Sequence, residues 1–525
     1  MKQSSVALRE REIIDPGVNE SDVIVGKDVL ELVTGAMYVD PLTIFREYIQ
    51  NAADAVDQAR LTGQLPKQGA RVDVALDLAS RSIIIRDTGT GISRARFWRT
   101  ITSIGASGKR GGKQRGFRGV GRLSGLGYCA ELSFRTRAAG EDVISEITWS
   151  ARRFRELLRD ATYEVGLATL IRDVVKIAVF DAGAADPSHF FEVRMNGVMR
   201  IRNDILLNPD EVASYLSQHG PVPFAPSFKF GGAIAKFLNG HDVPDPLMIF
   251  INDRKEPLYR SVENVIRTYG RDSDEISDVE FFKIPGLNGD SVDAVGWVAH
   301  HSYQGAIPRA ASYGGIRGRI GNIQVGGHQL IESLFLEQRF NSWCIGEFHV
   351  LSGRILPNGR RDDFEANAHL QNMMGHLTAL ATRLSKVCRD MSIQRNRLKR
   401  AGLLRKVIEE KLIVLKDPSA PVLLKEHYRS LVVKEIAELT RIAADKKFAE
   451  QDQMAVRRIV NKLERELAAI KAPRANHKAV SFLPKARRDT FLATIRMVIS
   501  ACDTPELAAI ITRRVFDRAR RKYSR

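Results

Sequence analysis

The chain of 525 residues is too long for one ordinary hydrophobic core, so we expect two to four domains. Its net charge of +18 arises in the last third, because residues 366–525 hold 35 Lys and Arg against 16 Asp and Glu. No apolar run approaches the roughly 20 residues of a membrane helix, and the polar amino-terminal stretch has no apolar signal region, so we expect a cytoplasmic protein without membrane contact. The scattered cysteines argue against a disulfide framework and a zinc site, and we expect ordinary buried thiols at Cys129, Cys344, Cys388 and Cys502.

After a short helix expected at residues 24–37, the stretch from Ile44 to Ala59 has helical spacing with two stripes. One stripe is apolar: Ile44, Tyr48, Ala52, Ala55 and Ala59. Beside it runs a polar stripe without Lys or Arg: Glu47, Asn51, Asp54 and Gln58. A solvated helix face normally includes Lys and Arg, and the alanines leave room for a ligand. We therefore expect one face of this helix to pack in a core and the other to line a site.

Residues 71–87 predict a β-hairpin, because alternating apolar residues are followed by a continuous run of three isoleucines. The second strand ends in Asp87-Thr88-Gly89-Thr90-Gly91. Two glycines one residue apart allow tight backbone turning at the end of a strand.

Residues 102–122 are rich in glycine and in Lys or Arg, which predicts a mobile lid or a phosphate loop. Gly116, Gly119 and Gly121 lead into an apolar pattern at residues 123–128, where we expect a helix to start. Backbone amides near a helix start form a natural anion site. We expect at most one or two of the loop cations to neutralise phosphate charge: Lys109, Arg110, Lys113, Arg115 and Arg118.

The rest of the chain alternates strands and helices before it becomes helical. Strands are expected at residues 131–137, 143–149, 168–173, 174–180 and 189–195. A helix and a proline-broken linker at residues 209–228 mark a candidate domain boundary. A second mixed region follows, with strands expected at residues 247–253 and 292–301. Long helices are expected beyond residue 366, where apolar residues keep helical spacing.

The basic last third admits two interpretations. One is a set of solvated helix faces, and the other is an electrostatic surface for nucleic acid or an acidic partner. Six cations lie close together near the end of the chain: Arg513, Arg514, Arg518, Arg520, Arg521 and Lys522.

The order and spacing of three motifs is far more specific than any one of them alone. Glu-x-x-x-Asn-Ala-x-Asp-Ala on a helix is followed by Asp-x-Gly-x-Gly after a strand, and then by Gly-x-x-Gly-x-Gly. This arrangement resembles the GHKL ATPases, the superfamily of gyrase, heat-shock chaperones of the ninety-kilodalton class, histidine kinases and MutL. The resemblance implies a Bergerat-type α/β sandwich that binds ATP, with the glycines at 89, 91, 116, 119 and 121 turning close to the nucleotide.

The chemistry of the residues agrees with the roles that the resemblance implies. Asp87 at a strand end can accept a hydrogen bond from the adenine amino group. Asn51 offers an oxygen ligand for Mg²⁺, and Glu47, one turn earlier, is placed to orient or deprotonate the attacking water. The alternative, that Glu47 and Asn51 merely cap or bridge within the helix, is disfavoured by the other two motifs. Asp54 is expected either to support the nucleotide site or to pair with a lid arginine.

The chain also departs from expected nucleotide-binding patterns. A P-loop is disfavoured, since no glycine-rich sequence ends in Gly-Lys-Ser/Thr. The Gly-Thr pair that usually precedes a late core strand in the GHKL superfamily is missing as well. Ser188 and His189, or Thr169 in an earlier strand, are the candidates to replace it.

The position of the ATPase motifs at the start of the chain and the presence of Glu47 favour hydrolysis over histidine phosphorylation. The second region, including residues 353–365, looks like the middle domain of the ninety-kilodalton chaperones. By that resemblance Arg361 would reach the terminal phosphate and stabilise charge during phosphoryl transfer. The alternative is that Arg360 and Arg361 only pair with Asp362 and Asp363 in a loop.

We thus predict three domains: a GHKL ATP-binding domain at residues 1–205, an α/β middle domain at 206–366 that supplies the arginine, and a basic helical domain at 367–525. The predicted protein is a Mg²⁺-dependent ATP hydrolase that works as a conformational machine of the heat-shock-ninety type on protein clients. It is expected to be a homodimer, at least when ATP is bound. The alternative is a nucleic-acid-associated ATPase resembling MutL or the MORC proteins, including a role in bacterial genome defence.

Overall fold

The computed structural model describes residues 40–65, 70–103, 121–160, 162–163, 166–269, 271–289, 291–445, 448, 450–472 and 480–523. They belong to two compact units that divide the chain between Ser385 and Lys386. The helix expected at residues 24–37 lies outside the described residues. So do Gly116, Gly119 and the five cations of the glycine-rich stretch.

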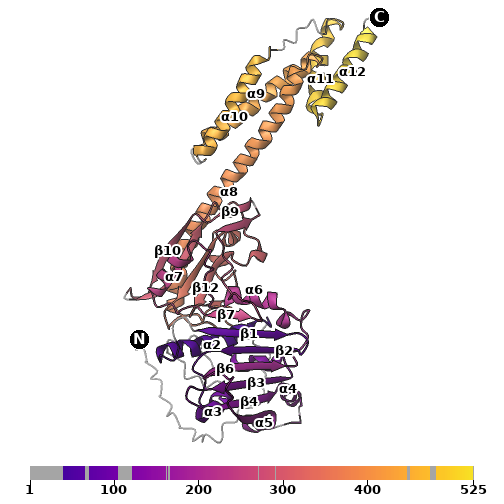
Figure 1. Ribbon diagram of the computed structural model, residues 1–525. Coiled ribbons are helices and arrows are strands. Elements are labelled where there is room, and N and C mark those ends of the chain that lie inside the picture. Colours follow the sequence, from indigo (N-terminus) through magenta and orange to yellow (C-terminus); the bar gives the residue numbers. More distant parts are fainter. Residues whose placement is uncertain are drawn as a thin grey trace, which may run out of the picture. The chain divides into compact units, whose positions relative to one another are not determined.

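The first unit contains a seven-stranded sheet in the order β5-β4-β3-β6-β2-β1-β7 (Figure 1). Its strands are β1 (Arg71–Asp77), β2 (Ser82–Asp87), β3 (Glu131–Arg137), β4 (Val143–Ser150), β5 (Val175–Asp181), β6 (Phe190–Asn196) and β7 (Met248–Ile251). All neighbours are antiparallel except β1 and β7, which are parallel. The predicted hairpin is confirmed, because β1 and β2 pair from Val72 with Asp87 to Asp77 with Ser82.

The two faces of this sheet differ in chemistry because side chains alternate along each strand. Val193 and Met195 of β6 belong to one apolar core, which also contains residues of the helices. Glu192 of the same strand is fully buried and forms ion pairs with arginines of three strands: Arg86, Arg135 and Arg194. One face is therefore packed with helices, and the other carries a charged network.

Helical segments contribute to the same core: α2 (Thr43–Leu61), α3 (Arg94–Thr102), the 3₁₀ helix η2 (Gly121–Gly127), α4 (Ala151–Arg159), α5 (Leu167–Val174), the 3₁₀ helix η3 (Ile205–Leu207) and α6 (Pro209–His219). Two expectations need correction here. Residues 168–173, expected as a strand, lie in α5, because Leu170, Ile171 and Val174 are buried at helical spacing. The helix expected to start near residue 123 is a 3₁₀ helix.

A five-stranded sheet in the order β10-β11-β14-β12-β13 completes the first unit, together with the hairpin β8-β9. The bounds are β8 (Val265–Thr268), β9 (Arg271–Glu275), β10 (Asp278–Pro285), β11 (Val292–His300), β12 (Gly315–Ile320), β13 (Ile323–Val325) and β14 (Ile345–Val350). Helix α7 (Gly231–Asn239) packs against it through a core that contains Ile234 and Trp297. Three 3₁₀ turns lie between these strands: η4 (Arg309–Ala311), η5 (Glu332–Leu334) and η6 (Gln338–Trp343).

The predicted domain boundaries at residues 205 and 366 stay predictions. Beyond the first of them, α6 and β7 still contribute to the core of the seven-stranded sheet. The strand expected at residues 247–253 is therefore present as β7, and it extends the first sheet through β1.

The second unit is helical, as predicted. It contains the part of α8 (Ala368–Lys416) from residue 386 onward, with α9 (Val422–Ala444), α10 (Glu450–Ala469), α11 (Lys485–Ser500) and α12 (Pro505–Tyr523). The helical spacing seen in the sequence corresponds to one core that includes Leu404, Ile408, Leu412, Val456 and Leu463. Among the helices that the structure describes, none is both long and apolar enough to cross a membrane.

Three cysteines are buried as expected, whereas Cys502 is only partly buried.

Candidate active site

Helix α2 places one acidic side chain inside the first unit. The helix is packed by Ile44, Tyr48, Ala52 and other apolar residues of the first core. Glu47 is only 4% exposed although it belongs to the polar stripe. Because a buried carboxylate is costly unless charged or polar groups surround it, Glu47 requires an explanation beyond folding.

The Asp-x-Gly-x-Gly loop packs directly onto α2. A Cβ atom at Gly89 would lie 2.5 Å from Cβ of Ala55, so only glycine fits between the loop and the helix. Gly91 has a φ of +63°, and a Cβ there would lie 2.1 Å from the carbonyl oxygen of Arg137. Gly89 is thus required to bring the end of β2 against the helix that carries Glu47, and Gly91 lets the loop pass close to the backbone of Arg137.

Asp87 sits at the base of this loop with its carboxyl group buried. Its Oδ1 accepts a hydrogen bond of 2.8 Å from the backbone N–H of Gly89, and Oδ2 has no hydrogen-bond partner among the described residues. Burial raises the pKa of Asp87 to about 7, and the hydrogen bond from Gly89 lowers it only in part. The free oxygen is an acceptor suited to an N–H donor of a ligand.

The third motif contacts Glu47 itself through Gly121. A Cβ atom at Gly121 would lie 2.1 Å from Oε2 of Glu47, so the backbone of η2 rests on the carboxylate. The hydroxyl of Tyr48 accepts a hydrogen bond of 2.9 Å from the N–H of Gly125 and fixes η2 on α2. The structure therefore brings the described parts of all three motifs to one place.

Arg361 lies beside Glu47 in the structure, although the two residues are far apart in the sequence. Its Nε lies 3.5 Å from Oε1 of Glu47, and its side chain is 15% exposed. The loop is held by its own backbone, with Arg361 N–H donating to Asn358 and Gly326 N–H donating to the carbonyl of Arg361. Arg361 has a φ of +57°, an unusual conformation for a residue other than glycine.

The alternative pairing of this loop is not seen in the described residues. Asp362 hydrogen-bonds with Asn358 in both directions, and neither Arg360 nor Arg361 forms an ion pair with Asp362 or Asp363 within the described part of the chain.

Arg46 is a site residue that the sequence reasoning missed. It is 6% exposed, its Nη2 lies 3.7 Å from Oε1 of Glu47, and the same nitrogen donates a hydrogen bond of 3.3 Å to the carbonyl of Arg360. It therefore bridges the carboxylate and the loop that carries Arg361. The sequence could have indicated this role, because an arginine among the apolar residues of a buried helix needs an anionic or carbonyl partner.

The remaining predicted residues are less tightly defined. Asn51 and Asp54 are partly exposed on α2, one and two turns after Glu47. Among the proposed replacements of the Gly-Thr pair, His189 lies at the loop, with Nδ1 2.7 Å from the carbonyl oxygen of Gly89. Thr169 is exposed on α5, so it is not in a strand as expected.

Comparison with known proteins supports the predicted resemblance to the GHKL ATPases. Residues 42–165 match the family model described as histidine kinase-, DNA gyrase B- and HSP90-like ATPase. These residues are similar to the ATP-binding domains of the GHKL ATPase family. A GHKL domain implies ATP binding, and the matched segment contains the first two motifs, Gly116, Gly119 and Gly121.

The GHKL domain is also similar to bacterial proteins named chaperone protein HtpG. The protein from Burkholderia lata is 27% identical over 163 residues, which cover 28% of this chain and 26% of the relative. The protein from Acinetobacter baylyi is 32% identical over 139 residues, covering 23% and 22%, and that from Methylorubrum populi is 40% identical over 88 residues, covering 16% and 14%. The chain thus spans about a quarter or less of the length of the relatives it matches.

Proposed function

We propose that the protein binds and hydrolyses ATP at the GHKL site, with Glu47 as the residue that orients or deprotonates the attacking water. The observation that carries this proposal is the meeting of Glu47 and Arg361 at 3.5 Å. A carboxylate that contacts water and a fixed guanidinium that stabilises developing phosphate charge are two parts that phosphoryl transfer to water requires. Oε1 of Glu47 is buried without a hydrogen-bond partner among the described residues, so it can accept a hydrogen bond from a bound water.

In the same proposal, Asp87 holds the adenine amino group through its free Oδ2. The glycines at 89, 91 and 121 leave backbone, rather than side chains, against the bound nucleotide, and Gly116 and Gly119 are assigned to the phosphates by the motif alone. Asp54 supports this site from α2. Arg46 is a positioning residue, since it contacts both Glu47 and the loop of Arg361.

The donor set fits a Mg²⁺ ion that is held mainly by the nucleotide. Asn51 is partly exposed on the same face of α2 as Glu47, and it supplies an amide oxygen of the kind that Mg²⁺ prefers. Among the described residues no group of three His, Cys, Asp or Glu residues could hold a metal by itself. When bound between Asn51 and the phosphates, Mg²⁺ would neutralise phosphate charge.

The proposed biological role is that of a conformational machine that acts on protein clients, as the name chaperone suggests for the HtpG relatives. Arg361 belongs to the region beyond the GHKL domain, so its contact with Glu47 offers a way to couple hydrolysis to a change in the position of that region. We further propose that two chains associate when ATP is bound.

A second candidate function rests on the surface of α12. Its six cations, from Arg513 to Lys522, are all exposed, and none forms an ion pair with another residue in the part of the chain that the structure describes. Acidic residues elsewhere in this unit are engaged with other cations, as in Arg397 with Asp445. Exposed arginines that form no ion pairs within the described residues suit a polyanion, so a nucleic-acid-associated ATPase is the alternative.

ATPase assays distinguish the two roles. Stimulation by DNA or RNA that is weakened by salt, and lost when Arg513, Arg514 and Arg518 are changed to Gln, would establish the nucleic-acid role. Stimulation by an unfolded protein, unaffected by those changes, would establish the chaperone role. Changing the exposed arginines Arg457 and Arg458 of α10 to Gln, compared with changing Arg513 and Arg514 alone, is the matched control for the loss of two positive charges.

A further inference from the structure

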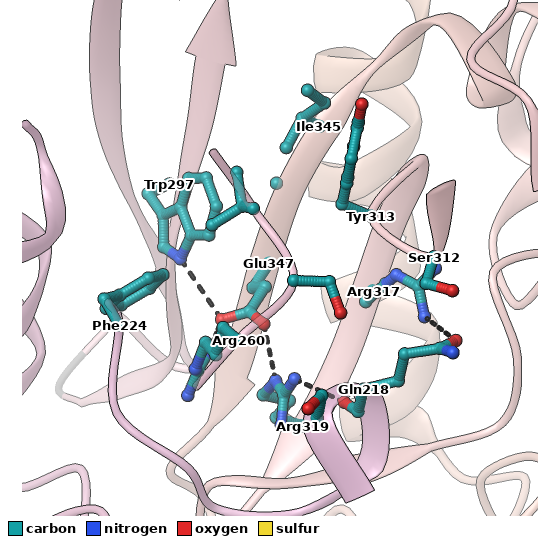
Figure 2. A pocket seen from close by; sticks show the side chains of 14 residues that line it. Gln218, Phe224, Arg260, Trp297, Ser312, Tyr313, Arg317, Arg319, Ile345 and Glu347 are labelled. Atoms are coloured by element: carbon teal, nitrogen blue, oxygen red, sulfur yellow. Dashed lines mark hydrogen bonds and ion pairs between the residues drawn. The ribbon is translucent and has the colours of Figure 1, made fainter. Parts of the chain in front are cut away.

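Three buried arginines cluster at the second sheet of the first unit, with Arg317 and Arg319 on β12 and Arg260 beside them (Figure 2). Arg260, Arg317 and Arg319 are 6%, 7% and 1% exposed. They line a cavity of about 30 Å³ whose other polar residues include Ser261, Ser312 and Tyr313. Three buried positive charges in one place require negative charge nearby.

The cluster contains one carboxylate, Glu347, and both of its oxygens have partners. Oε1 accepts a hydrogen bond of 2.7 Å from Nε of Arg319, and Oε2 accepts from Arg260 and, at 3.3 Å, from Nε1 of Trp297. Burial raises the pKa of Glu347, but Arg260 and Arg319 outweigh it and hold that pKa well below its usual range. Glu347 is thus committed to two of the three arginines.

Arg317 donates hydrogen bonds only to neutral partners, although the charge of Glu347 acts to raise its pKa. Its Nη1 donates to Oε1 of Gln324 at 3.1 Å and to Oε1 of Gln218 at 3.4 Å, and its Nη2 donates to the carbonyl of Gly314 at 3.1 Å. Its Nε is buried and has no hydrogen-bond partner in the described part of the chain. Burial lowers the pKa of Arg317 to about 10, which still leaves the group charged at neutral pH.

The positive excess also affects histidines around the cluster. Burial lowers the pKa of His349 to about 4 and that of His219 to about 3; Arg319 contributes to both shifts, and Arg46 contributes more than Arg319 to that of His219. Neutral histidines add no charge, so the cluster holds three guanidinium groups against one carboxylate. A buried charge without a counter-charge is strongly unfavourable, whereas a guanidinium and an oxyanion form charge-assisted hydrogen bonds.

We propose that the cavity beside Arg317 binds a small oxyanion, a carboxylate or a phosphate group, which supplies the missing negative charge. The planar guanidinium matches two oxygens of such a group, and the hydroxyl of Ser261 is a further donor in the cavity lining. A cavity of about 30 Å³ has room for a group of a few atoms and excludes a nucleotide. The site is therefore distinct from the proposed ATP site and does not depend on ATP hydrolysis.

The test measures thermal unfolding of the full-length protein in acetate or in inorganic phosphate, each against chloride at equal ionic strength. The midpoint should rise by at least about 2 °C with one of the two anions, and the anion that acts identifies the carboxylate or the phosphate as the ligand group. The same rise should occur in the Asp87→Asn variant, because that change lies in the nucleotide site. An absence of any anion effect in the wild-type protein overturns the proposal.

Two variants assign the effect to Arg317. Arg317→Gln should lose the response, while Arg309→Gln, at an exposed arginine nearby in the chain, should keep it. Gln218→Glu places a carboxylate where an oxygen now lies 3.4 Å from Nη1 of Arg317, so it should raise the midpoint in chloride and abolish the anion response. If Arg317→Gln does not fold, Gln218→Glu decides by itself. An equal anion response in wild type and Gln218→Glu refutes the proposal.

Discussion

Replacing Asp87 by Asn should make the nucleotide-free protein more stable while it abolishes nucleotide binding. The buried carboxyl has a pKa of about 7, raised from an ordinary value of 3.8, and its side chain is almost fully inaccessible. A difference of about three pKa units corresponds to about 4 kcal/mol between the two protonation states. Asn keeps an oxygen that accepts from the N–H of Gly89, but it removes the charge whose burial is unfavourable.

The sign of the pH dependence follows from the protons bound in each state. Between about pH 4 and pH 7 the folded protein holds a proton on Asp87 that the unfolded chain has released, so the stability of the wild type falls as pH rises through this range. Above pH 7 Asp87 is ionised in both states, so the full free-energy cost of burying its charge lowers the stability of the folded protein. The gain from Asp87→Asn should therefore be about 2 kcal/mol at pH 5 and about 4 kcal/mol at pH 8.

Urea denaturation at the two pH values, followed by tryptophan fluorescence, measures this difference. All four tryptophans, Trp98, Trp149, Trp297 and Trp343, lie in the first unit, so the signal reports on the unit that contains Asp87. Asp77→Asn serves as the control. Hydrogen bonds from Ser80 lower the pKa of this exposed carboxyl, so removing its charge should not increase the stability of the protein. A gain for Asp87→Asn that is the same at pH 5 and pH 8, or absent, would refute the reasoning.

Four further outcomes are expected. Glu47→Ala should retain nucleotide binding, measured by calorimetry, and lose turnover by about 10²-fold or more, whereas equal hydrolysis would remove Glu47 from the mechanism. Arg361→Ala should slow turnover by about 10²-fold or more with binding little changed, and an unaffected rate would contradict the role of this loop. Gly121→Ala should lower turnover and destabilise the fold by about 1–3 kcal/mol, because the added Cβ would collide with Glu47. ATPase assays and urea denaturation measure the two effects, and a fully active variant would contradict the packing. Nucleotide affinity should fall about tenfold per pH unit below pH 7, because binding of the adenine amino group needs the ionised form of Asp87. An affinity that calorimetry finds constant between pH 5.5 and pH 7 would exclude that contact.

The sequence by itself determined the local elements and the ATPase motifs. Alternation at period two and spacing at period 3.6 are properties of neighbouring residues, so the hairpin of β1 and β2, the helix around Glu47 and the helical second unit were predictable. The same locality explains the error at residues 168–173: a short apolar run fits a strand or a helix, and only packing of Leu170 and Ile171 in the first core decides between them. Glycine spacing, likewise, indicated turns without showing what each glycine touches.

Only the tertiary structure decided which distant residues meet. Glu47 and Arg361 are separated by more than 300 positions, and their contact depends on the packing of two α/β regions. Arg46 is a proposed positioning residue because its guanidinium donates a hydrogen bond to the carbonyl of Arg360. Arg317 is part of the proposed anion site because it is buried and donates hydrogen bonds to neutral groups. Burial and charge pairing are set by residues far apart in the chain, so they are absent from any local pattern, and they are what placed Arg46 and Arg361 beside Glu47 of the polar stripe.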